Sequence, residues 1–116
     1  MAVILNKAGY DRAVYLISKG GFEIFDEDIN EIMPTIEEIN HYLDTHNMEE
    51  FGIWFLGIET DADKNIREHY VYPHGDLHEV QRSLLEHTQE KAAKAGHKEI
   101  AQAAQRLLAL IDESDL

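Results

Sequence analysis

The sequence predicts an α+β fold with two N-terminal helices, a β-hairpin and a C-terminal antiparallel helix pair. Three observations support this fold class. Apolar residues recur with a helical period in both halves of the chain. Between them, the segment FGIWFLGIET (51–60) is rich in the aromatic and β-branched residues that favour strands. The length of 116 residues suits a single domain, 1–116, whose one core needs no disulfide.

Two helices are expected in the first half of the chain. The first should cover about 6–19, because Gly20 and Gly21 then supply a left-handed stop, and GFEIF reads as an extended segment after it. Thr35, with Glu38 three residues later, forms a capping box that should start a second helix ending near Asn47. The apolar face of this second helix would consist of Ile36, Ile39, Tyr42 and Leu43.

The β-hairpin is predicted from two strand-like segments on either side of the turn sequence DADKN. The first is FGIWFLGIET and the second is NIREHYVY. Trp54, Leu56 and Ile58 would share one face of the first strand, while Ile53 and Phe55 would share the other. Both faces are therefore apolar, and if the helices cover one of them, the other needs a cover or a partner.

The C-terminal helix pair is predicted to begin at Asp76. With Glu79 three residues later, Asp76 reads as the N-cap of an acidic capping box. Gly96 should close this helix, and HKEIAQAAQRLLALID (97–112) should form the next one. The turn between them is short, so the two helices should be antiparallel neighbours.

The excess negative charge of the chain comes from one block of residues. The net charge is −13, and the 44 residues from Gly20 to Asp63 hold 13 acids and no lysine or arginine, whereas acids and bases balance elsewhere. Such a chain lacks the basic face that direct nucleic-acid binding needs, and a basic protein partner is favoured instead. Solubility alone, or mimicry of a nucleic acid toward a basic groove, would also explain the block. The candidate binding residues are Asp26, Glu27, Asp28, Glu31, Glu37 and Glu38.

The segment HGDLHE suggests an alternative, a small metal-binding protein or metal-dependent enzyme that uses His74, Asp76 and His78. GDLH also matches part of the first metal motif of calcineurin-like phosphoesterases, but Glu79 stands where that motif needs glycine, and its further motifs do not follow. The capping interpretation explains Asp76 without a metal.

A calcium loop is a second metal hypothesis. Asp26, Asp28 and Asn30 occupy the first ligand positions of such a loop, and Glu37 falls at its twelfth position. Glu31 stands where the loop requires glycine, so the turn that gathers the ligands is missing.

Signatures of catalysis and of membrane attachment are not found in the sequence. It contains no GxGxxG, P-loop, HExxH or GxSxG motif, so we expect a non-enzymatic protein without a cofactor. It contains no cysteine and no apolar run of the ~20 residues that span a membrane. We therefore expect a cytoplasmic protein that binds no membrane.

From Trp54 onward the pattern W-x-LGIE, Y-x-YPHGDLHEVQRS and LLALID resembles a family of small bacterial proteins with no known activity. The resemblance covers roughly the C-terminal half and implies a free-standing bacterial domain, without a functional residue that could be transferred. The matching residues are Trp54, Leu56, Gly57, Pro73, Gly75, Asp76, Val80 and Arg82.

The two-faced hairpin and the charge block together predict a homodimer. A two-stranded unit must be covered to be stable, and its edges invite pairing. Apolar hairpin or helix residues should lie at the centre of the dimer. Asp26, Asp28 and Glu31 should lie outside the contact, since like charges repel.

Overall fold

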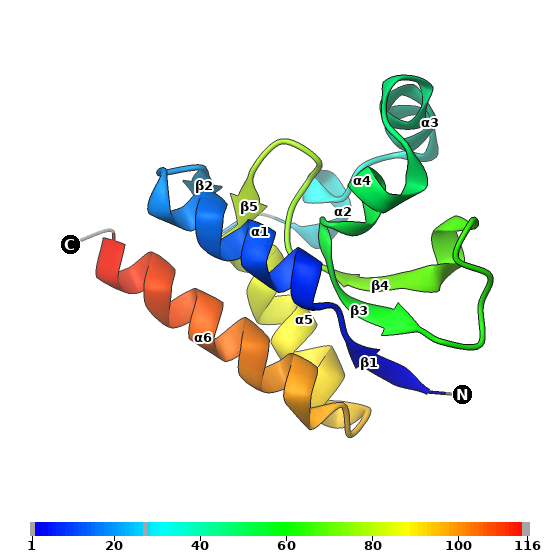
Figure 1. Cartoon of the computed structure of the whole chain (residues 1–116). Helices are drawn as coiled ribbons and strands as arrows, with labels where there is room; N and C mark the ends of the chain where they lie inside the picture. The colour runs from blue at the N-terminus through cyan, green and yellow to red at the C-terminus, as the bar shows by residue number, and fades with distance from the viewer. Residues whose placement is uncertain (1, 27, 115–116) are drawn as a thin grey trace.

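The computed structural model describes residues 2–26 and 28–114, and in this part of the chain helices pack against a small antiparallel sheet (Figure 1). The predicted α+β class and the close packing of the C-terminal helix pair are confirmed. The elements are β1 (Val3–Leu5), α1 (Lys7–Ser18), β2 (Phe22–Glu23), α2 (Ile29–Ile32), α3 (Ile36–Thr45), α4 (Met48–Gly52), β3 (Phe55–Glu59), the 3-10 helix η1 (Arg67–His69), β4 (Tyr70–Pro73), β5 (Val80–Gln81), α5 (Arg82–Lys94) and α6 (Lys98–Ser114).

The predicted hairpin is present as β3 and β4, but it belongs to a three-stranded antiparallel sheet in the order β1-β3-β4. Strand β1 pairs along the other edge of β3, with Val3 opposite Glu59. The sequence did not predict β1, because a three-residue strand has no periodicity and its partner lies more than 50 residues later in the chain. The strand after the turn is also shorter than NIREHYVY, since η1 occupies its first half.

The main core lies between α1, the sheet and the pair α5–α6. Alanines on the facing helices, among them Ala92 and Ala104, are fully buried and allow the close approach of the pair. Gly96, with φ 81°, closes α5 as predicted. The buried residues of the main core are Ala13, Ile17, Leu56, Val80, Leu85, Ala92, Ile100, Ala104, Leu107, Leu108 and Ile111.

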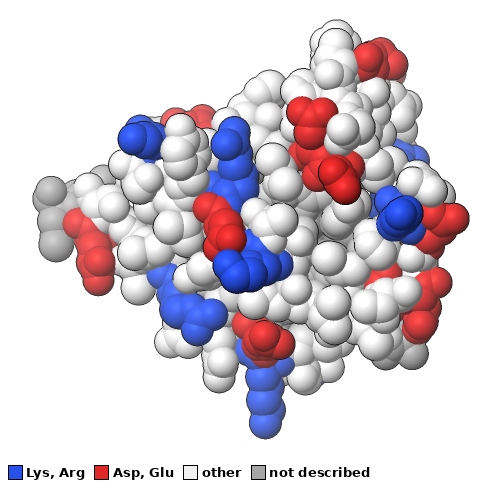
Figure 2. All heavy atoms as spheres, viewed as in Figure 1, with Lys and Arg blue, Asp and Glu red and all other residues white. Residues whose placement is uncertain are grey.

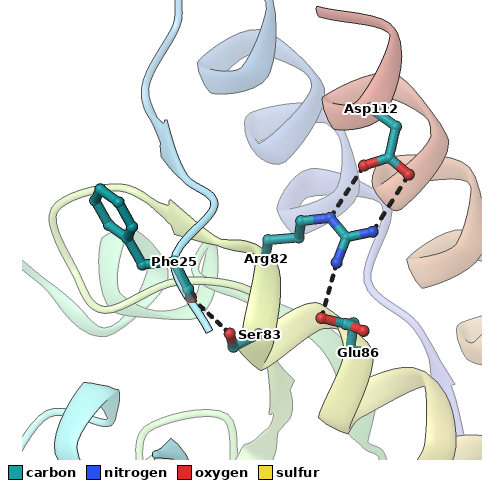
Figure 3. Close-up of polar contacts among 5 residues, drawn as sticks. All are labelled: Phe25, Arg82, Ser83, Glu86 and Asp112. Atoms are coloured by element: carbon teal, nitrogen blue, oxygen red, sulfur yellow. Dashed lines mark hydrogen bonds and ion pairs between the residues drawn. The ribbon is translucent and has the colours of Figure 1, made fainter. Parts of the chain in front are cut away.

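Polar contacts fix the first turn of α5 to its surroundings (Figure 3). The Arg82 guanidinium donates to both carboxylate oxygens of Asp112 on α6, at 3.0 and 3.3 Å, and to Glu86 at 2.9 Å. The Ser83 hydroxyl donates to the carbonyl oxygen of Phe25 at 2.8 Å, while the ring of Phe25 points away from this bond. These contacts join α5 to α6 and to the segment that follows β2.

A second, smaller cluster consists of the buried residues Phe51, Trp54 and Leu77. Helices α3 and α4 lie on this small cluster, and α3 projects from the rest of the molecule at the top right of Figure 1. Helix α3 starts at the predicted capping box, yet it buries no residue, and Ile36 on its predicted apolar face is 64% exposed. Few contacts therefore hold α3.

The predicted helix start at Asp76 is wrong, because α5 begins at Arg82. The backbone amides before it make tertiary bonds: Val80 donates to the carbonyl oxygen of Gly21, and Gln81 donates to that of His74. Leu77 adopts φ 74°, which a right-handed helix cannot contain. The segment instead forms a loop and β5, which pairs in parallel with β2. None of the described helices is long and apolar enough to cross a membrane.

Candidate functional site

A groove of about 680 Å³ lies between α3 and the loop 75–78. Both sets of residues that the sequence singled out contribute to it. Two of the predicted acidic residues come from α3, and two of the three predicted metal ligands come from the loop opposite. The groove is lined by Arg12, Glu37, Glu38, His41, Tyr42, Thr45, His46, Trp54, Asp76, Leu77 and His78.

The floor of the groove is aromatic and held in place by hydrogen bonds. Trp54 is only 5% exposed, and its indole Nε1–H donates to the hydroxyl oxygen of Tyr42 at 3.3 Å. The Tyr42 hydroxyl in turn donates to the carbonyl oxygen of Glu50 at 3.3 Å. The ring of Tyr42 stacks on that of His46, with ring centroids 3.8 Å apart. This row presents a preorganised apolar surface to a ligand.

One rim of the groove is the loop 75–78, which Asp76 holds together. Its Oδ1 accepts the backbone N–H groups of His78 and Glu79 at 3.0 and 2.9 Å, and its Oδ2 accepts Gln81 Nε2–H at 3.1 Å. Asp76 therefore accepts backbone amides as predicted, although it does so in a loop and not at a helix start.

The same loop is seated on Trp54. A Cβ at Gly75 would come within 2.7 Å of the Trp54 ring, so only glycine fits at this position. Leu77 has the strained backbone angle φ 74°, and only 7% of the residue is exposed because it packs in the small cluster. Packing on Trp54 therefore holds this rim in place in addition to the hydrogen bonds of Asp76.

The other rim is the face of α3 that carries Glu37, Glu38 and His41. The backbone N–H of Glu38 donates to Thr35 Oγ1, and the Glu38 carboxylate accepts the backbone N–H of Thr35, so part of its hydrogen-bonding capacity stabilises the helix start. Among the described residues no side chain or backbone group bonds the Glu37 carboxylate. Carboxylates thus stand on both rims, with Glu37 available to a ligand.

His74 lies beneath the floor and not in the groove. Its side chain is fully buried, 5.7 Å from the Trp54 ring between centroids, and its Nε2–H donates to the Ile53 carbonyl oxygen at 2.8 Å. Burial lowers the pKa of His74 to about 4, although the bond to Ile53 acts in the opposite direction. Within the described residues, Nδ1 of this neutral ring has no hydrogen-bond partner.

The three residues of the metal hypothesis are therefore separated by their environments. His74 is buried behind Trp54, Asp76 accepts three hydrogen bonds, and His78 is exposed at the rim. Across residues 2–26 and 28–114, no group of three or more histidines and acids is arranged to hold a metal ion.

The remaining predicted acids lie outside the groove lining. The Asp28 carboxylate caps α2 by accepting the backbone N–H of Asn30 at 2.8 Å, so the segment of the calcium hypothesis contains a short helix. Asp26 and Glu31 are exposed, and Glu27 lies outside the described residues. On the face shown in Figure 2, basic side chains lie mainly over α1 and α6 with some acidic ones among them, whereas acidic side chains predominate at the end formed by α3 and α4 and near the turn between β3 and β4.

Sequence reasoning missed the role of the aromatic residues. Tyr42 was placed on the apolar face of the second helix and Trp54 on one face of the first strand, whereas both residues also line the groove. Arg12 was not singled out at all; it lines the groove, and its guanidinium lies 5.3 Å from the centroid of the Tyr15 ring. No local pattern marks these residues, since the groove joins segments distant in the chain.

No family model, curated protein or solved structure matches this chain.

Proposed function

We propose that this protein is a non-enzymatic interaction module that binds a basic segment of a partner protein in the groove. The observation that carries the proposal is the placement of carboxylates on both rims, Glu37 and Glu38 on one side and Asp76 on the other, above an aromatic floor. A lysine or arginine side chain matches this arrangement, because its stem packs on apolar surface while its charged end reaches carboxylates.

The charge of the surrounding surface supports the same partner. The block from Gly20 to Asp63, without a lysine or arginine, creates a negative field that steers a basic chain toward α3. Arg12 works against a cation at one end of the groove. The lining holds three carboxylates, those of Glu37, Glu38 and Asp76, against this one guanidinium, so the carboxylates set the local preference.

The proposal is tested by NMR titration of the labelled protein with an arginine-rich nonapeptide. Shift changes should centre on residues 37–46, on 76–78 and on the Trp54 indole N–H. The double variant Glu37→Gln and Glu38→Gln should weaken binding roughly tenfold, because charge-assisted contacts are lost. Glutamine at Glu38 preserves the capping box, so α3 should remain folded.

Glu50→Gln is the matched control. Glu50 occupies the same capping-box position in α4, where it bonds the backbone of Asn47, and it does not line the groove. This variant should retain most of the affinity. Because the control removes one charge and the double variant two, a control loss of half the double variant's loss in binding free energy, or more, would show that net charge alone attracts the peptide and would reject the groove as the binding site.

We also propose that two copies of the chain associate through the sheet. Ile4, Ile58 and Tyr70 stand opposite one another in register, so they form an apolar row across the three strands. Ile4 is 49% exposed, and the other two residues are only half-buried. A second copy would cover this row, with the acidic residues of α2 and α3 outside the contact.

Sedimentation velocity at micromolar concentration tests the association. A dimer should form, and its stability should stay level or rise modestly with salt, since screening reduces repulsion between the acidic copies. Ile4→Lys should shift the population toward the monomer. A monomer of the unchanged protein at both low and high salt would reject the dimer.

A further inference from the structure

A second hollow, of about 500 Å³, lies between the sheet and α5, away from the groove. Its walls are largely apolar and aromatic, with Phe55, Tyr70, Val71 and Pro73 among them. The hydroxyl of Thr88 on α5 donates to the carbonyl oxygen of Pro73 at 2.8 Å and so joins the two walls. The volume suits a small organic molecule.

Tyr72 lines this hollow in a strained conformation. Its φ is 62°, a left-handed conformation that non-glycine residues rarely adopt. The strain places the ring over Gly57, where a Cβ would lie 3.0 Å from the Tyr72 ring and 2.9 Å from Val71. Both Gly57 and the unusual backbone are therefore needed to seat this ring.

The Tyr72 hydroxyl is bonded to His97 Nδ1 at 2.7 Å. His97 is itself fixed on both sides: its backbone N–H donates to the Ala92 carbonyl oxygen at 2.8 Å, and its own carbonyl oxygen accepts the N–H of Ala101 at 3.1 Å. The polar pair is thus preorganised at the wall of an apolar hollow.

Helix α5 adds a lysine and a histidine to the same hollow. His87 and Lys91 lie four residues apart on one face of α5, and both line it. Lys94, one turn further, pairs with Glu90 at 3.1 Å, whereas no described residue forms a salt bridge with Lys91. Glu59 is the acidic residue of the lining, and it stands on β3 opposite Val3 of β1.

We propose that this hollow binds a small aromatic carboxylate. The flat body of such a ligand would pack against Phe55, Tyr70 and Tyr72, because aromatic rings favour offset or edge-to-face contacts. Its carboxylate would accept hydrogen bonds from Lys91 and from the histidines beside it, and bonds of this charge-assisted kind are strong. The net charge of −13 disfavours anion binding elsewhere on the surface, so we expect the carboxylate ligand to bind only in this hollow.

The probe is 2-naphthoate, titrated into the full-length protein and followed by NMR, with the uncharged 2-naphthamide as its matched partner. We expect saturable binding of 2-naphthoate, with shift changes at the ring signals of Tyr72, His87 and His97. Binding of 2-naphthamide should be roughly tenfold weaker, because it leaves Lys91 unpaired.

Two exposed lysines on α5 provide the variants. Lys91→Gln should weaken 2-naphthoate binding roughly tenfold, and Lys91→Arg should restore it. Lys94→Gln removes a cation from the same helix without touching the hollow, and it should leave the affinity unchanged. The proposal would be overturned if acid and amide bound equally, or if the two glutamine variants had equal effects. It would also be overturned by shift changes confined to the groove, or by no binding at millimolar 2-naphthoate.

Discussion

The main core and the small cluster differ in how completely their elements are packed. In the main core, α5 and α6 present a stripe of buried residues to each other and to the sheet, and eleven residues are buried there. The small cluster contains three buried residues, and the helix α3 that lies on it buries none. The groove opens beside this loosely packed helix. The proposed peptide site therefore lies away from the main core, beside the less tightly packed part of the molecule.

This difference has a physical basis in the length and composition of the two regions. Helix α6 extends over 17 residues and buries six apolar ones, whereas α3 has 10 residues and buries none. A short helix gains most of its stability from tertiary packing, which α3 largely lacks. Regions of this kind open locally at low free-energy cost and commonly serve in binding.

The largest effects should come from truncating one residue in each region. Leu107→Ala in the main core should cost about 2–5 kcal/mol of unfolding free energy, and Trp54→Ala in the small cluster about 3–5 kcal/mol. Urea denaturation measures both costs. Hydrogen exchange then separates them: Trp54→Ala should raise exchange in α3 far more than in α6, while Leu107→Ala should raise it throughout. Equal protection of α3 and α6 in the unchanged protein would contradict the comparison.

Lowering the pH should reduce the free energy of unfolding by a similar amount, because His74 is buried in its neutral form. In the folded protein its pKa is about 4, against 6.5 for the exposed side chain, so only the unfolded chain binds this proton in the range between them. Stability is thus lost as pH falls from about 6.5 toward 4, by about 3 kcal/mol. His74→Gln retains a donor for the Ile53 carbonyl oxygen but does not titrate.

The difference between the unchanged protein and His74→Gln isolates this residue. Burial, and then the negative charge of Glu23, raise the pKa of Glu79, which favours the folded state as pH falls. That opposing contribution is common to both proteins and cancels in the difference. Urea unfolding at several pH values should show a flatter profile for His74→Gln. Parallel profiles would mean that His74 is not buried in its neutral form.

A smaller loss should follow from removing the carboxylate that holds the groove rim. Asp76→Ala deprives the N–H groups of His78 and Glu79 of their acceptor, at a cost of about 1–3 kcal/mol. Because Leu77 is strained, the loop should also become mobile, and the affinity for the arginine-rich peptide should fall. Asp76→Asn keeps one acceptor oxygen and should be milder. Stoichiometric zinc or iron that is lost in Asp76→Ala would instead support the metal hypothesis.

The smallest effect is expected on the surface of the helix pair. Arg82→Gln removes the paired hydrogen bonds to Asp112, whose pKa this guanidinium lowers. Both side chains are partly exposed to solvent, so screening limits what the pair contributes. Thermal unfolding should show a slight decrease in Tm at low salt that vanishes at high salt. A large decrease that persists in high salt would show that Arg82 is required for packing the pair.

Much of the architecture was determined by local sequence. The helices α1, α3 and α6 begin and end close to the predicted residues, because periodicity, the capping box of Thr35 and the glycine stops act over a few positions. The hairpin was predicted for the same reason, from β-favouring residues around a turn. The acidic block and its location were also evident, since charge is a property of the chain itself.

The tertiary structure alone decided the remainder. Strand β1 forms because β3 offers its other edge, and β5 forms because β2 lies beside it, so neither pairing is encoded locally. Tertiary contacts also explain why no helix begins at Asp76. The backbone hydrogen bonds of Val80 and Gln81 and the packing of Gly75 on Trp54 stabilise a loop there more than a local cap stabilises a helix. The groove and the hollow exist only where such distant segments meet, and long-range packing sets both.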